Sequence, residues 1–133
     1  MIAEIRTALA DACTSVGLNA SGYITDDIQT PAAIIGWTDW PYDYTFGRAS
    51  DGPSVWTITL IIERTDETGA QVALDDWIDY ASPLCVKTVL ETEAVREAAG
   101  VEFVWVRRAS GVQQIQMGSV NYLSAELSVE VVV

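Results

Sequence analysis

The chain has 133 residues, of which half are apolar and a fifth are charged. This length and composition fit a single folded domain over residues 1–133 and exclude a disordered chain. Acidic residues outnumber basic ones by 19 to 7, which gives a formal net charge of −12. Because tight binding to a nucleic-acid backbone needs clustered lysine and arginine, we expect no specific nucleic-acid binding.

The sequence shows no sign of a membrane segment or of secretion. The longest apolar run, residues 56–62, is far too short to span a bilayer. The first residues lack the basic, apolar and cleavage regions of a signal peptide. We therefore expect a soluble protein made in a cytoplasm, with no membrane partner. Cys13 and Cys85 are too few for a disulfide framework, and Cys13 lies on the apolar side of an expected helix, which favours a buried free thiol.

The charge is unevenly distributed along the chain. Residues 63–102 carry ten acids and three bases, whereas residues 103–133 carry two of each. A neutral C-terminal part beside an acidic remainder indicates a surface that another molecule covers.

The N-terminal half is expected to contain one helix and two strands. Apolar residues at helical spacing predict a helix over about residues 2–16, which Gly17 ends. Strict alternation of apolar residues predicts a strand over 55–64, with Trp56 and Ile58 on its inner side. Between them we expect a connection at 18–30, a buried strand at 32–37 and a long aromatic loop at about 39–54.

The C-terminal half is expected to begin with two helices and to end in strands. An apolar stripe from Ala70 to Ala81 predicts the second helix, and Ser82-Pro83 is a favourable start for the third. The strands expected after them are 101–108, 112–117 and 120–132, joined as a three-stranded meander by turns at 110–111 and 118–119. The order of elements predicts an α+β fold, with helices packed on one face of a mixed, mostly antiparallel sheet.

Residue types that carry catalysis are sparse. The chain contains no histidine, which removes the commonest general base and zinc ligand, and no nucleotide-binding glycine motif is present. Two pairs of acids, Asp26-Asp27 and Asp75 with Asp79, are better explained by turn chemistry and a solvated helix face. We therefore expect no enzyme activity, no cofactor and no metal.

The expected loop is rich in aromatic side chains, with five between Trp37 and Phe46. They either tuck the loop onto the sheet or form a contact with another protein, because aromatics followed by an arginine are typical of interface centres. Trp37 is expected in the core. The residues that could contact a neighbouring subunit or partner are Trp40, Tyr42, Tyr44, Phe46 and Arg48 from this loop, and Arg107 and Arg108 from a strand end.

Two segments resemble tail terminator proteins of long-tailed actinobacteriophages. The first is Tyr42-Asp-Tyr-Thr-Phe-Gly-Arg48 followed by Asp51, and the second is the closing segment from Asn121 to Val131. The intervening elements follow in the family's order, so the likeness covers nearly the whole chain from Ile5 onward. The sequence departs from the pattern at Ser124, where glycine is usual, and in having Trp40 before the aromatic loop.

The resemblance implies a structural virion protein without catalytic residues. It implies a homo-oligomer, a hexameric ring that caps the head-proximal end of the tail tube and ends its polymerisation. The implied partners are the tail tube protein and the head–tail connector, or stopper, with DNA passing through the ring. The implied location is the head–tail junction of the virion, after assembly in the host cytoplasm.

Two other interpretations stay open at this point. A head-completion or stopper protein of the neck is also small, acidic and ring-forming, and its partner would be the portal or adaptor instead of the tube. A small-molecule binding module, or an unrecognised enzyme, belongs to a different class and would behave as a monomer with one deep pocket.

Overall fold

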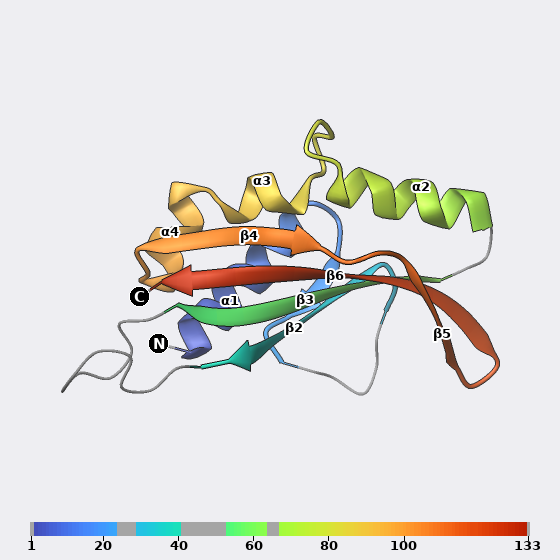
Figure 1. Cartoon of the computed structure of the whole chain (residues 1–133), viewed down its shortest axis with the longest axis horizontal. Coiled ribbons are helices and arrows are strands. Elements are labelled where there is room, and N and C mark those ends of the chain that lie inside the picture. Colours follow the sequence, from blue (N-terminus) through green and yellow to red (C-terminus); the bar gives the residue numbers. More distant parts are fainter. Residues whose placement is uncertain (1, 24–28, 41–52, 64–66, 133) are drawn as a thin grey trace.

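The computed structural model of this protein describes residues 2–23, 29–40, 53–63 and 67–132. Within these residues, six strands form one mixed sheet in the order β1-β2-β3-β6-β4, with β5 also paired to β6 (Figure 1). The elements in chain order are α1 (Ile2–Ser15), β1 (Asn19–Ser21), β2 (Ala32–Asp39), β3 (Ser54–Glu63), α2 (Glu67–Ile78), α3 (Val86–Leu90), α4 (Glu93–Ala99), β4 (Phe103–Ala109), β5 (Gln113–Met117) and β6 (Val120–Val132). The predicted α+β class is confirmed.

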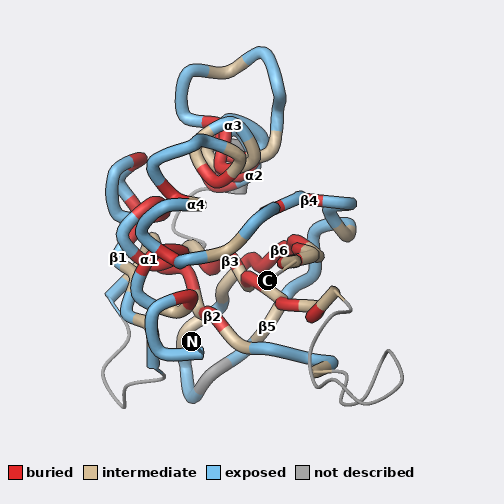
Figure 2. The backbone as a smooth tube through the Cα atoms, turned by 90° about the vertical axis from the view of Figure 1, so that its left-hand side faces the viewer, coloured by how far each residue is buried: buried red, intermediate tan, exposed pale blue. Residues whose placement is uncertain are grey.

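The core lies between the helices and one face of the sheet (Figure 2). Along β3, Trp56, Ile58 and Leu60 alternate with half-buried residues and are completely buried. Antiparallel pairing places Trp56 opposite Val129 and Ile58 opposite Leu127 of β6. Because opposed side chains on one face touch, these two alternating strands form one continuous apolar surface, as their sequences predict.

The helix α1 packs against β1 and β2 of the sheet and against α3 and α4. Its buried side contains Ile5, Leu9 and Cys13, at the spacing expected for one helix face. Gly17, with φ of 93°, follows the helix in the left-handed conformation, which confirms it as the stop signal. The Trp77 indole nitrogen of α2 donates a hydrogen bond to the Val16 carbonyl, over 3.0 Å, and so ties the second helix to the end of the first.

The strand arrangement differs from the predicted one in two places. Residues Asn19 to Ser21, expected to be part of a connection, form β1, which pairs in parallel with β2. The predicted C-terminal meander is wrong, because β4 and β5 do not pair with each other. They lie end to end along β6, which is long enough to pair with both: β4 pairs with residues 127–132 and β5 with residues 120–124.

The helices after β3 also differ from the prediction. The second helix ends at Ile78, so Ala81 is exposed and not part of the inner stripe. The predicted start of the third helix at Ser82-Pro83 is wrong, because the Ser82 hydroxyl accepts a hydrogen bond from the Leu84 amide in a turn and α3 begins at Val86. A further helix, α4, was not predicted.

The signals that define α4 are visible in the structure. The Thr92 hydroxyl accepts a hydrogen bond from the Val95 amide at the N-terminus, and Gly100, with φ of 69°, ends the helix. These are a standard N-cap and a standard C-terminal glycine. The acids Asp75 and Asp79 are exposed, as predicted for a solvated surface.

One tryptophan lies differently from expectation, and a second is placed beside the core. Trp37, expected in the core, is 47% exposed. Trp40, expected at a possible interface, is half-buried and packs edge-on against Trp56, with ring centroids 6.2 Å apart. At Trp40 the chain therefore follows the alternative in which the aromatic segment tucks onto the sheet.

Both cysteines are buried and free, as predicted, and Cys13 provides a pH-dependent test of the core. Burial raises the pKa of the Cys13 thiol from 9.0 to about 12. Between these values the unfolded state loses a proton that the folded state keeps, so the free energy of unfolding falls as the pH rises. Urea denaturation over this range should show a shallower fall in Cys13→Ala than in the original protein; equal slopes would contradict the buried thiol.

Candidate interaction surface

The face of the sheet away from the helices carries two large exposed aromatic side chains on β4. Val104 and Val106 point into the core, and the residues that alternate with them, Phe103 and Trp105, are 59% and 51% exposed. Alternation along a strand places these two rings on the outer face. Trp105 is opposite Glu130 of β6. Exposed aromatic pairs of this size on one strand are typical of surfaces that contact other molecules.

An irregularity in β4 places two arginines beside these rings. The register with β6 shifts between Val106 and Arg108, which is the two-against-one geometry of a β-bulge. The Arg107 guanidinium lies 4.1 Å from the centre of the Trp105 ring, a cation–π contact, and its Nε atom is 3.9 Å from a carboxylate oxygen of Glu130. We call Phe103, Trp105, Arg107 and Arg108 the β4 face.

The free edge of β4 is covered at one residue by an ion pair from α3. The Lys87 ammonium lies 2.7 Å from the Glu91 carboxylate and donates a hydrogen bond to the Val106 carbonyl, over 3.3 Å. The Glu91 carboxylate in turn accepts a hydrogen bond from the Val106 amide, over 3.3 Å. Both backbone groups of Val106 are therefore satisfied by one helical i,i+4 pair.

A hollow of about 250 Å³ adjoins the β4 face where this edge meets the helices. Its lining combines apolar residues with three of the chain's seven basic residues, Lys87, Arg107 and Arg108. The other lining residues are Trp77, Ile78, Trp105, Val106, Ala109 and Leu127. In a protein of net charge −12, this gathering of cations over apolar residues favours contact with a group that is both acidic and apolar.

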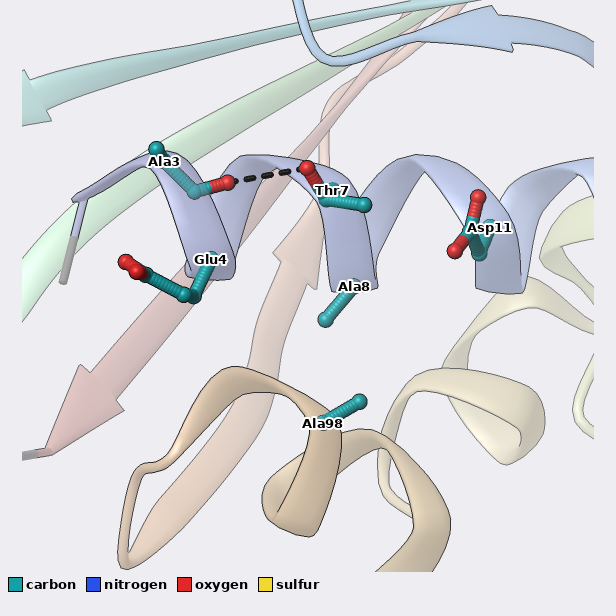
Figure 3. A pocket seen from close by; sticks show the side chains of 6 residues that line it. All are labelled: Ala3, Glu4, Thr7, Ala8, Asp11 and Ala98. Carbon is teal, nitrogen blue, oxygen red and sulfur yellow. Dashed lines mark hydrogen bonds between the residues drawn. The ribbon is translucent and has the colours of Figure 1, made fainter.

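The helix side of the molecule presents a different surface. A hollow of about 340 Å³ lies between α1 and α4, lined by Ala3, Glu4, Thr7, Ala8, Asp11 and Ala98 (Figure 3). Ala8 and Ala98 point toward one another across it, and the carboxylates of Glu4 and Asp11 lie along its rim. The Thr7 hydroxyl donates to the Ala3 carbonyl of its own helix, over 3.0 Å. We call this hollow the α1–α4 groove.

Among the described residues, no group of three acidic or cysteine side chains is placed to hold a metal ion. In the same part of the chain, no helix has the length and apolar character needed to cross a membrane. Of the two surfaces described above, the β4 face combines exposed aromatic rings with clustered basic residues, and we take it as the main candidate interaction surface.

The structure brings together two of the predicted interface residues. Arg107 and Arg108 lie together at the end of β4 and are exposed. Trp40 is half-buried and packs against Trp56, and its role at an interface stays a prediction. The remaining predicted residues, Tyr42, Tyr44, Phe46 and Arg48, lie outside the described residues.

The sequence analysis missed Phe103 and Trp105. A signal for them exists, since aromatic residues alternate with valines directly before the two arginines. That alternation does not say which of the two sides the helices cover.

Comparison with known proteins identifies no relative of this chain. No protein-family model matches the chain, and a search of curated proteins found no match to it.

Proposed function

We propose that this protein is a structural assembly subunit that forms a ring on the head-proximal end of a bacteriophage tail tube and ends its growth. The proposal rests on the resemblance of residues 42–51 and 121–131 to tail terminator proteins. The observation on the structure that supports it best is the β4 face, two exposed aromatic rings with two arginines in an otherwise acidic chain.

The physical reason is that an assembly subunit needs a surface that is both adhesive and specific. Large aromatics and arginines provide much of the affinity in protein interfaces, because the rings bury much area at a small loss of entropy and the guanidinium offers several hydrogen-bond donors. The strong negative charge of the rest of the chain disfavours contact with DNA, which suits a ring through which DNA passes. In this proposal the partners are further copies of the chain, the tail tube protein and the head connector.

Electron microscopy of the purified protein mixed with tail tubes, together with its mass in solution, tests the proposal. The expected result is a hexameric ring at one end of tubes, and tubes that no longer lengthen when more tube protein is added. Tubes that keep growing, with bare ends, would refute the proposal. A ring that ignores tubes and binds the portal complex would assign the protein to the stopper role instead.

A further inference from the structure

We infer that the β4 face docks into the α1–α4 groove of a second copy of this chain, so that subunits join head to tail. The inference deepens the proposed function by naming the contact between subunits. That this contact closes a ring rests on the proposed function. The contact itself is argued from the two surfaces alone.

The first step is that the β4 face is not complementary to itself. The β4 face carries two arginines and only one neighbouring acid, Glu130, so two copies placed face to face bring an excess of positive charge together, which opposes association. Glu130, 3.9 Å from Arg107, compensates part of one charge, and Arg108 still lies beside it on the exposed strand end. Charge therefore favours a contact between this face and a different, acidic surface of the partner copy, which makes the contact heterologous.

The second step is that the same chain carries a hollow of opposite charge that short side chains line. The α1–α4 groove has an alanine-lined floor, where short side chains leave room for an aromatic ring, and a carboxylate rim. Asp11 is exposed on that rim. Glu4 already takes part in an interaction within the chain, so the expected ion pair is between Asp11 and an arginine of the β4 face.

The third step is that the two surfaces face away from each other. The groove lies between the helices α1 and α4, and the alternation along β4 places Phe103 and Trp105 on the face of the sheet away from the helices, so one copy can offer both at once. A subunit that gives one surface and receives the other continues from copy to copy, and it closes into a ring when the rotation between neighbours allows. The Trp105 ring, supported by the Arg107 guanidinium, is the group that enters the groove.

Charge reversal tests this contact. Sedimentation velocity over a wide range of concentration should show self-association of the original protein. Arg107→Glu with Arg108→Glu, and separately Asp11→Lys, should each weaken association at least about tenfold. Combining both changes should restore most of the affinity, because the ion pairs re-form with exchanged signs. Asp75→Lys, an equal charge change at an exposed position on α2, should leave association unchanged. A protein that stays monomeric at all concentrations, or a combined variant no better than either parent, would overturn the inference.

A cross-linking experiment gives a readout that does not depend on affinity. Two variants, Phe103→Cys and Ala98→Cys, are mixed under mild oxidation and should form a mixed disulfide dimer in preference to either homodimer. The chain's own Cys13 and Cys85 are buried, so the background is low. Homodimers formed as readily as the mixed dimer would overturn the inference.

These outcomes are separable from those of the proposed function. Rings held by this contact that fail to cap tubes would refute the terminator role and keep the contact. Capping by the arginine double variant as efficiently as by the original protein would keep the role and refute the contact.

Discussion

Replacing Trp56 by alanine is expected to lower the free energy of unfolding by about 3–5 kcal/mol, enough to unfold much of the protein at growth temperature. Trp56 is completely buried at the centre of the sheet. Its indole nitrogen donates to the Ser54 hydroxyl over 3.0 Å, and the edge of the Trp40 ring packs on it. Removing the ring leaves a cavity that rigid β-strand neighbours cannot close.

Urea denaturation followed by circular dichroism measures this loss, since the signal does not depend on tryptophan fluorescence. The matched control is Trp105→Ala, the same chemical change at a residue that is 51% exposed. Its cost should stay near about 1 kcal/mol, from lost contact with Arg107. Equal losses in the two variants would show that Trp56 is not the centre of the core.

The second large effect is expected at Arg6. Its guanidinium donates hydrogen bonds to the Gly22 carbonyl over 2.8 Å and to the Ile35 carbonyl over 3.2 Å. These bonds join α1 to the residue after β1 and to β2. It also lies 5.5 Å from the centre of the Trp56 ring and 5.0 Å from that of Tyr23. Arg6→Leu keeps apolar bulk and leaves both carbonyls without this donor, so a loss of about 2–3 kcal/mol is expected.

A conservative change at the same residue separates charge from geometry. Arg6→Lys keeps the positive charge, but a single ammonium cannot reproduce the planar group that both donates to two carbonyls and stacks on rings. We expect most of the loss to persist in Arg6→Lys. The control is Arg108→Leu, which removes an exposed guanidinium and should change the free energy of unfolding by less than about 0.5 kcal/mol. Full stability in Arg6→Lys would mean that charge alone acts at this position.

The parts of the fold that could be predicted are those with strong local patterns. The alternation along β3 and β6 predicted two central strands with the correct buried sides, and Gly17 marked the end of α1. The parts that could not be predicted depend on pairing at a distance. The short strand β1, Asn-Ala-Ser, has no apolar pattern and forms because its backbone pairs with β2. The Ser110-Gly111 pair predicted a turn, but the chain makes no turn there: β5 continues along the edge of β6 with which β4 also pairs.

Only part of the candidate surface could be predicted from the sequence. Arg107 and Arg108 stand out by charge in an acidic chain, so they could be found without a structure. Phe103 and Trp105 could not, because an aromatic residue on a strand is equally compatible with the core. Trp37 shows the converse error: its apolar surroundings predict burial, yet it is 47% exposed although its register partner Trp56 is completely buried.

The ion pair that holds Val106 has a consequence for solubility. A strand at the margin of a sheet offers unpaired amides and carbonyls, and such margins recruit strands from other molecules into aggregates. In the middle of β4, Lys87 donates to the Val106 carbonyl and Glu91 accepts from the Val106 amide. An incoming strand would therefore have to displace this ion pair before it could pair with Val106 and extend the sheet. The exposed aromatic side chains of the β4 face can therefore lie beside this edge while the backbone of Val106 is closed to an incoming strand.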